Sequence, residues 1–493
     1  MEQTFDGMKI VTARPVSNWF NDIHTHPRVI AYPTHPRHLQ RIVRDTKTFP
    51  SPLRAVGSIH STTACFEADT GTVVVMKAFN HMSLGVDAEG NPTVTAGAGA
   101  RFFEVAEFLR RHQLQFYVNV EIGDLTMGAA ACVGTKESAF PGEHGQVSSY
   151  LQSVKMINAR GEWVEIPSPQ QELDLQTLRS SYGLLGFVYE VTFQVKKLTA
   201  MAVRHRTFTL QEFVEFLHTG LKDLEKQGTS IMLYLDPFTR KHLFMGPRGL
   251  ITAELRTYVD ADPAASTRWQ WKLRNFVWRD AAPRFAHLAA RFVPFRFLRN
   301  ALLNTANWVN HFFLRTVIRG RNTQPPAQII RYPHKGGPGK YTFSILAFPE
   351  KGYSEVLSWY FAFCQRHEAK HGYRSNLLSV GYRTFQDQRS LLSYSYEGNS
   401  MTADPVSTGT PGWREFLAEY HASAEKHGGV PLFNQTPGVT AGAAWQAFGQ
   451  RLRKLARIRD RLDPTGRFLN PFFKALLEEP LPQHLGHSMR KAG

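Results

Sequence analysis

Cysteine is scarce in this chain, and long apolar runs are missing. Only three cysteines occur among 493 residues, far apart and without a Cys-x-x-Cys pair. This pattern argues for a reducing compartment and against a disulfide framework or a cysteine metal site. No run of 18 or more apolar residues occurs, so no membrane-spanning helix is predicted. The opening MEQTFDGMKI lacks the regions of a secretion signal, so we expect a cytoplasmic location.

Acidic residues are also few: 41 Asp and Glu face 58 Lys and Arg, a formal net charge of +17. Such a charge indicates an anionic partner: nucleic acid, a membrane surface or an acidic substrate. Metal binding is not expected, because the His-x-His of HTHP (24–27), with His35 nearby, has no clustered acids or thiols.

The shortage of acids is greatest in residues 268–321, which hold ten Arg, one Lys and a single acid, Asp280. The segment also contains four of the nine tryptophans. Arginines interleaved with aromatics are typical of a helix lying in a membrane interface. The same mixture could stack on single-stranded nucleic acid, or its aromatics could pack on their own domain while the arginines face water. We expect an anionic membrane surface, with the protein peripheral on the inner face, and no nucleic acid.

Short strands and helices alternate over residues 30–200, which predicts an α+β domain. TVVVMKAF (72–79) and FVYEVTFQVKKL (187–198) have strand character, and residues 151–166 read as a hairpin. Residues 92–113 predict a strand, a glycine turn and then a helix. A chain of this length exceeds one ordinary core, so further domains are expected.

Three segments rich in glycine and small residues are candidate binding loops. In RAVGSIHS (54–61), Gly57 and Ser58 allow backbone N–H groups to converge on a phosphate, with His60 just beyond. EIGDLTMGAAACVGT (121–135) offers backbone to a flat ring, and SYGLLGFVYEV (181–191) is the third. Each segment alone is more often a plain turn.

Taken in order, these segments resemble the vanillyl-alcohol oxidase type of FAD-linked oxidoreductases, in particular the aldonolactone and alditol oxidase branch. AYPTHPRHLQRIV (31–43), YRTFQDQRSLLSYSYEGNS (382–400) and RLDPTGRFLNPFF extend the resemblance over nearly the whole chain. It implies an α+β fold with a two-subdomain, PCMH-type FAD-binding domain at 15–199. A substrate or cap domain at 200–450 carries the insert 268–321, and segment 451–493 returns to the flavin.

The resemblance implies FAD as the cofactor, with the pyrophosphate at residues 56–61. His60 stands where many family members attach the flavin 8α-methyl group covalently, which raises the flavin potential and prevents its loss. The predicted cofactor-binding residues are Val56, Gly57, Ser58, Ile59, His60, Ser61, Thr126, Met127, Gly128, Ala129, Val133, Gly134, Thr135, Val188 and Asn470.

The chain departs from the branch at the polar residues of the substrate site. Gly381 stands in place of the acid that precedes Arg383, LFNQ (432–435) replaces a His-Trp-Gly-Lys run, and THGT becomes Thr135-Lys136-Glu137. Alcohol oxidation needs a proton acceptor and donors near the reduced flavin. The predicted catalytic residues are Arg383, Tyr394, Glu121 and Asn434, and no general base can be named.

These departures favour oxidation of a lipophilic or membrane-held alcohol, such as a sterol or a lipid-linked sugar, with O2 or a quinone as electron acceptor. Two alternatives remain open. One is a soluble sugar-lactone or alditol oxidase. The other is a flavin-binding interaction module without turnover.

Overall fold

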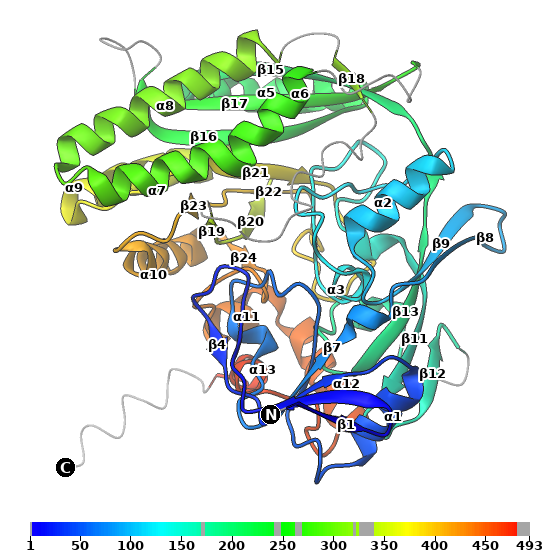
Figure 1. Cartoon of the computed structure of the whole chain (residues 1–493). Helices are drawn as coiled ribbons and strands as arrows, with labels where there is room; N and C mark the ends of the chain where they lie inside the picture. Colours follow the sequence, from blue (N-terminus) through cyan, green and yellow to red (C-terminus); the bar gives the residue numbers. More distant parts are fainter. Residues whose placement is uncertain are drawn as a thin grey trace, which may run out of the picture.

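The computed structural model describes residues 2–168, 173–240, 248–261, 269–318, 322–324 and 340–480. Two five-stranded sheets and an eight-stranded sheet form the body of the chain. Figure 1 shows the eight-stranded sheet with its helices above the two smaller sheets. No helix among the described residues is long and apolar enough to cross a membrane.

The first sheet has a parallel centre that ends at the predicted phosphate loop. Its order is β1 (Glu2–Phe5), β2 (Met8–Thr12), β5 (Val29–Tyr32), β7 (Thr72–Val75) and β6 (Leu53–Val56). Strand β7 pairs in parallel with both β5 and β6. The strand expected at 72–79 therefore ends at Val75, where a 3-10 turn begins. Helix α1 (Pro36–Arg44) buries its apolar side chains in the core beside this sheet.

The second sheet is antiparallel throughout and covers the core of the FAD-domain half. Its order is β12 (Trp163–Ile166), β11 (Leu151–Asn158), β13 (Gly186–Gln194), β9 (Pro92–Gly97) and β8 (Met82–Val86). The predicted hairpin is β11–β12, and the expected strand–turn–helix unit is β9 followed by α2 (Phe102–Arg111). Helix α3 (Met127–Cys132) packs in the same core. Short strand pairs and a helix complete this half: β3 (Val16–Ser17) with β4 (His24–Thr25), β10 (Leu114–Gln115) with β14 (Lys196–Lys197), and α4 (Leu175–Leu178).

The eight-stranded sheet is antiparallel and belongs to the second half of the chain. Its order is β18 (Asn322–Gln324), β15 (Ala200–Thr209), β17 (Arg248–Val259), β16 (Thr229–Arg240), β21 (Ser379–Thr384), β22 (Ser400–Thr402), β20 (Leu346–Pro349) and β24 (Val430–Pro431). A short pair, β19 (Thr342–Phe343) with β23 (Val406–Ser407), lies separately.

Side chains of this sheet alternate between two differently covered faces. Ile231, Leu233 and Leu235 pack in the core formed with α5 (Leu210–Lys226) and α9 (Tyr353–His371), against which α10 (Trp413–Ala424) also packs. Met232 and Tyr234 point to the other face, toward the insert. The insert forms α6 (Trp269–Phe276), a π-helical turn at Val277–Ala281, α7 (Ala282–Phe292) and α8 (Arg296–Thr316).

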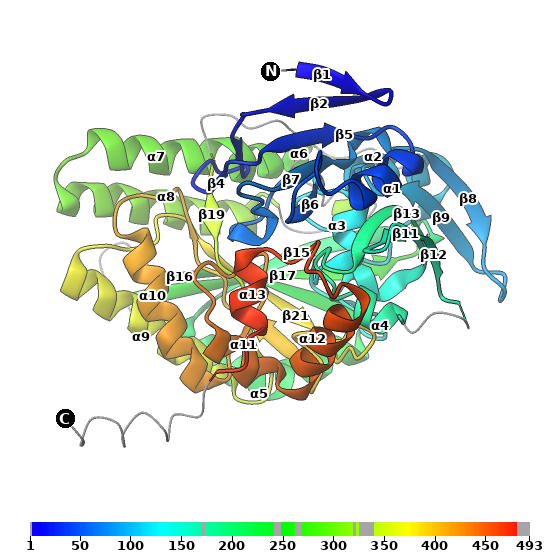
Figure 2. The ribbon, with the colours of Figure 1, turned by 90° about the horizontal axis from the view of Figure 1, so that it is seen from below.

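The C-terminal segment returns to the FAD-domain half and fastens it. Helices α11 (Ala441–Phe448), α12 (Gln450–Leu462) and α13 (Pro471–Leu477) share a core with Tyr182 and Leu184 (Figure 2). The buried Arg467 donates hydrogen bonds to the carbonyls of Ile42 and Val43. This part of the chain therefore ties distant segments of the first half together.

Candidate active site

A cavity of about 300 Å³ lies between the two halves of the molecule. The loop after β6, helix α3 and residues 120–122 contribute one wall, and β21 and the 432–435 segment contribute another. Three residues of the insert, Trp278, Ala282 and Pro283, also line it. Most of the lining is apolar, with a polar group at Lys136, Glu137 and Asp404.

The backbone of the 57–61 loop is shaped to receive an anionic ligand. A side chain at Gly57 would place its Cβ 2.3 Å from Thr126 Oγ1, so only glycine fits. Ile59 adopts a φ of 54°, a left-handed conformation that folds the loop sharply. Within the described part of the chain, the N–H groups of Ser58 to Ser61 donate to no protein acceptor. Unpaired amides at a cavity wall are a site for phosphate oxygens.

His60 lies in the same wall with its side chain 12% exposed. Its Nε2 is 3.4 Å from Asp124 Oδ2, and its ring lies against Trp19 with 5.4 Å between the ring centres. The carboxylate and the indole therefore hold the imidazole in place at the cavity wall.

Most of the predicted cofactor residues line the cavity. They are Val56, Gly57, Ser58, Ile59, His60, Ser61, Thr126, Gly128, Ala129, Val133, Thr135 and Val188. Three lie behind its wall. Met127 is fully buried in the FAD-domain core, and Gly134 lies against Leu432 and Gln146.

The third residue behind the wall, Asn470, acts on the loop from outside. It is the N-cap of α13, and its side-chain amide donates to the carbonyls of Ala64, Cys65 and Glu67. These three carbonyls belong to the turn directly after the 57–61 loop. Asn470 therefore holds the loop in position rather than contacting a ligand in the cavity.

Of the four predicted catalytic residues, two line the cavity and two do not. Glu121 and Asn434 line the cavity, and Glu121 Oε2 accepts a hydrogen bond of 3.1 Å from the Tyr382 hydroxyl. Tyr394 is buried against Leu432, behind the cavity wall.

Arg383 does not reach the cavity, and its expected role at the reduced flavin is corrected by the structure. Residues Val380 and Tyr382 of β21 line the cavity, and the strand period of two turns Arg383 to the opposite face. There its guanidinium forms ion pairs with Glu350 and Glu225. The expectation came from the position of Arg383 in a sequence motif. That motif did not show which face of the strand the Arg383 side chain would occupy.

Glu137 is a cavity residue that sequence reasoning did not select. Its Oε1 accepts a hydrogen bond of 3.0 Å from Arg256. Its Oε2 is buried and accepts no bond from the described residues. Burial raises the pKa of Glu137 to about 7; Arg256 opposes this rise, and the charge of Glu121 adds to it. The carboxyl therefore changes protonation near neutral pH, as a general base does.

A buried ion pair lies beside Glu137. Lys136 Nζ is 2.9 Å from Asp404 Oδ2, and both side chains are almost fully buried. The same Nζ lies 3.8 Å from the centre of the Tyr382 ring. The replacement of the expected THGT by Thr135-Lys136-Glu137 was the signal available in the sequence. This replacement places two charged residues, Lys136 and Glu137, in the cavity wall.

Other polar oxygens in the cavity wall also lack donors. Asn434 Oδ1 and Gln435 Oε1 are buried and accept no bond from the described residues. Together with the free amides of the 57–61 loop, they offer both donors and acceptors to a large polar ligand. The residues present therefore fit a flavin dinucleotide.

Buried contacts anchor the insert to the sheet. Arg274 forms an ion pair with Glu254 and donates to the Tyr234 hydroxyl at 2.6 Å. Although burial opposes its charge, Arg274 and Arg256 hold the pKa of Glu254 well below its ordinary value. Trp278 stacks on Tyr234 with 4.6 Å between ring centres. The inner face of the insert is thus fixed.

The outer face of the insert is apolar. Twelve of the fifteen exposed large hydrophobic side chains among the described residues lie there. They are Trp269, Leu273, Phe276, Phe285, Leu288, Phe292, Phe295, Phe297, Leu298, Leu302, Val309 and Phe312. The alternative reading, in which the aromatics pack inward while the arginines face water, does not describe these residues, and Arg274 is buried. Residues 268 and 319–321 of the insert lie outside the described residues.

Comparisons with known proteins agree with this geometry. Residues 27–167 match a sequence family described as an FAD binding domain. The chain is 22% identical over 468 residues to L-gulonolactone oxidase of Bos taurus, covering 93% of this chain and 97% of that protein. It is 24% identical over 296 residues to D-arabinono-1,4-lactone oxidase of Candida albicans, covering 57% of this chain and half of that relative.

A solved structure has the same fold. Cholesterol oxidase from B. sterolicum superposes with a TM-score of 0.71 at 15% identity, over 96% of this chain and 98% of that one. The fold and the cavity define an FAD-linked oxidoreductase. Residues 27–167 form an FAD-binding domain of the PCMH type, and lactone oxidases are among the relatives that the whole chain resembles.

Proposed function

We propose that the protein oxidises a lipophilic alcohol that it takes from an anionic membrane surface. The observation that carries this proposal is the double role of the insert. Trp278, Ala282 and Pro283 line the cavity, and the outer face of the same helices is exposed and apolar. One element thus joins the cavity to a surface suited to lipid.

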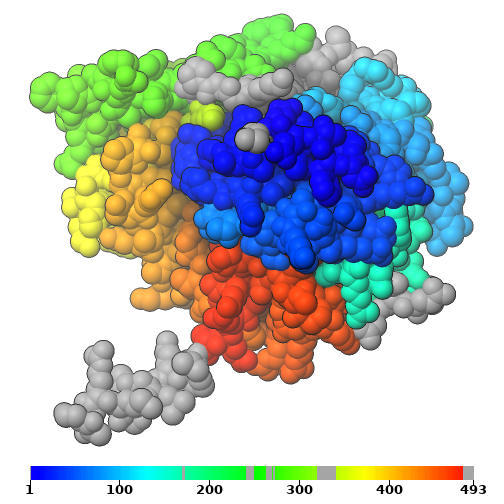
Figure 3. Space-filling view, turned by 60° about the horizontal axis from the view of Figure 1, so that its bottom comes forward, coloured from blue at the N-terminus to red at the C-terminus, as the bar shows by residue number. Residues whose placement is uncertain are grey.

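The charge of the insert supports the choice of an anionic membrane. Asp280 is the only acid in residues 268–321, and it is paired with Arg279 at 2.7 Å and, more loosely, with Arg284 at 4.0 Å. Arginines on α7 and α8 are left to bind lipid headgroups while the phenylalanines enter the boundary region. Figure 3 shows this part of the molecule, in green at the upper left, projecting from the body. We place the protein peripherally on the inner face of the membrane.

Bound FAD would supply the hydride acceptor. The residues of this chain would bind the cofactor, orient the substrate and take its proton. The amides of Ser58 to Ser61 would bind its phosphate oxygens, and His60, which lines the same cavity, would carry the covalent link. Glu137 Oε2 takes the hydroxyl proton of the substrate. Lys136 and Asn434 orient the oxygen from which that proton leaves. Trp278 excludes water from the side of the insert. Oxygen or a membrane quinone would be the final electron acceptor.

A second candidate is oxidation of a sugar lactone or alditol in solution. The observation that favours it is the polar group of Lys136, Glu137 and Asp404 inside the cavity. These charges suit a substrate with several hydroxyl groups. The lactone oxidases named among the relatives point the same way.

The first experiment is an absorption spectrum of the purified protein, followed by acid precipitation. Yellow colour in the pellet that is absent from His60→Ala identifies a covalent flavin. Colour in the supernatant supports a flavoenzyme whose flavin is not covalently bound. A colourless protein that takes up no added FAD contradicts the proposal.

The substrate class is then decided by anaerobic reduction of the bound flavin. A sterol in anionic vesicles and a soluble aldonolactone are compared at equal concentration. Faster bleaching by the sterol supports the lipophilic substrate, and faster bleaching by the lactone supports the second candidate. Bleaching by neither, in a protein that holds FAD, identifies a flavin-binding module without turnover.

A further inference from the structure

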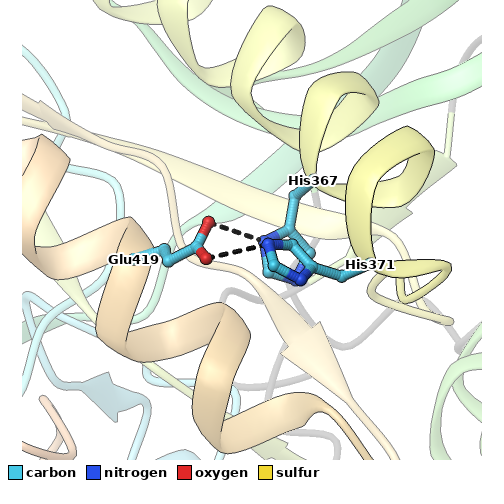
Figure 4. A group of neighbouring side chains, drawn as sticks. All are labelled: His367, His371 and Glu419. Atoms are coloured by element: carbon cyan, nitrogen blue, oxygen red, sulfur yellow. Dashed lines mark hydrogen bonds and ion pairs between the residues drawn. The ribbon is translucent and has the colours of Figure 1, made fainter.

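Far from the 57–61 loop, two histidines and a glutamate meet on the outer side of the second half. His367 and His371 lie four residues apart on α9, so they share one face of that helix. Glu419 projects toward them from α10, as Figure 4 shows. His367 Nδ1 is 3.1 Å from Glu419 Oε2, and His371 Nε2 is 2.9 Å from Glu419 Oε1.

The three ligand atoms are close enough to share one ion. All lie within 4.8 Å of one another. In a tetrahedral zinc site with bonds of about 2.0–2.1 Å, neighbouring ligand atoms are about 3.3 Å apart. The two histidine–carboxylate distances need to lengthen by only a few tenths of an ångström to admit the ion.

The cluster combines one fixed ligand with two accessible ones. The side chain of His367 is 1% exposed and lies between Phe363 and Phe416. Those of His371 and Glu419 are 37% and 43% exposed, so an ion can enter from solvent.

We propose that His367, His371 and Glu419 form a divalent-metal site that binds Zn²⁺ and joins α9 to α10. Two imidazoles and a carboxylate are a donor set suited to zinc, and three protein ligands leave a fourth position for water. The sequence HEAKH (367–371) contains the spacing His-Glu-x-x-His, which sequence reasoning missed.

The role assigned to this metal is structural rather than hydrolytic. In hydrolytic sites with this spacing the glutamate acts on the metal-bound water. Here the Glu368 carboxylate instead accepts a hydrogen bond from Asn300 of α8. The metal would fix the C-terminal end of α9, which leads through the next few residues to Leu377 and Leu378 of the cavity wall.

Two features of the site limit its affinity for Zn²⁺. His367 Nε2 is buried with no partner among the described residues, so coordination through Nδ1 leaves an N–H unpaired. Lys370 Nζ lies 3.9 Å from Glu419 Oε1 and competes with the ion. A missing partner on the second nitrogen costs about 10–100-fold in affinity. We expect micromolar rather than nanomolar binding.

The test is a titration of tag-free, EDTA-treated protein with ZnCl2 by calorimetry, repeated with CoCl2 by visible absorption. The three cysteines are all buried, so thiols will not compete. The wild type should bind one ion at this site and gain several degrees in Tm with excess zinc. His371→Gln and Glu419→Gln should each weaken this binding at least about 30-fold.

The matched control is His81→Gln. His81 is an exposed histidine that pairs with a single carboxylate, Glu190, at 2.8 Å. This control should bind zinc like the wild type. If His371→Gln and the wild type give the same titration and the same Tm gain, the cluster is only a set of ion pairs, and the proposal fails. If Glu419→Gln does not fold, the exposed His371 variant decides alone. Flavin content is measured separately, so failure here is distinct from failure of the proposed function.

Discussion

Helices α8 and α9 are nearly equal in length and cover opposite faces of the eight-stranded sheet (Figure 1). The large apolar side chains of α9 are buried in the core, and charged residues such as Arg366 and Lys370 face water. On α8 the arrangement differs: Phe297 is 84% exposed, and Val309 and Phe312 are about half exposed.

The difference shows what each face of the sheet is for. The α9 face is closed by a packed apolar core, with the ion pairs of Arg383 and the His367–His371–Glu419 cluster beside it. The other face opens inward to a cavity through Trp278 and outward to an exposed apolar surface. An apolar patch of this kind on a monomer marks an interaction site. The substrate chemistry is therefore expected on the α8 side, and groups with a structural role are expected on the α9 side.

The largest effect is expected at Glu137, on the cavity side. Glu137→Gln should slow anaerobic flavin reduction about 10²–10⁴-fold, because a general base is lost. In the wild type the rate should rise with pH through about 7, since the base must be deprotonated and burial raises its pKa to about 7. Glu350→Gln on the opposite face is the control and should keep the wild-type profile. A pH profile unchanged in Glu137→Gln would exclude this residue as the base.

The next effect concerns Arg383, on the α9 side. Arg383→Met leaves the carboxylates of Glu350 and Glu225 without their cation. Because both carboxylates are partly exposed, we expect a loss of about 2–3 kcal/mol in unfolding free energy, less than for a fully buried pair. Flavin reduction should change less than about threefold. A hundredfold slower reduction with an unchanged Tm would instead show that Arg383 acts on the flavin.

The smallest effect is expected on the outer face of the insert. Replacing Phe295 and Phe297 together by serine should weaken binding to anionic vesicles about tenfold, since a phenylalanine that enters the membrane boundary only partly contributes about 0.7 kcal/mol, less than one that is fully buried. Val86→Ser, at an exposed apolar residue outside the insert, is the control. If both variants sediment equally with the vesicles, the outer face of the insert does not bind the membrane. If the wild type instead retards single-stranded DNA in a gel and the variant without the two phenylalanines does not, the surface binds nucleic acid.

The fold, and the position of the 57–61 loop in the cavity wall, were predictable because their signals are local. Gly57 and the residues around it form a turn whose backbone geometry depends on a few neighbours. The long motif-bearing segments also kept their order along the chain. The cavity accordingly contains most of the cofactor residues named from the sequence.

The catalytic groups were harder to predict because they depend on contacts between distant segments. The orientation of Arg383 follows from the parity of β21, which a shift of one residue would reverse. The pKa of Glu137 depends on Arg256, more than a hundred residues away, and on burial that only the assembled halves provide. The exposed face of the insert depends on buried anchors such as Arg274, which composition alone did not reveal.

The hydrogen bonds from Asn470 have a consequence for the order of events during synthesis. The turn after the 57–61 loop is held by a side chain encoded about 400 residues later. Domains generally fold as they leave the ribosome, the N-terminal part first. Here the FAD-binding domain would emerge early but lack its final support until residue 470 has been made. Cofactor capture would thus come near the end of translation, and a chain stalled before that point would be released without its flavin.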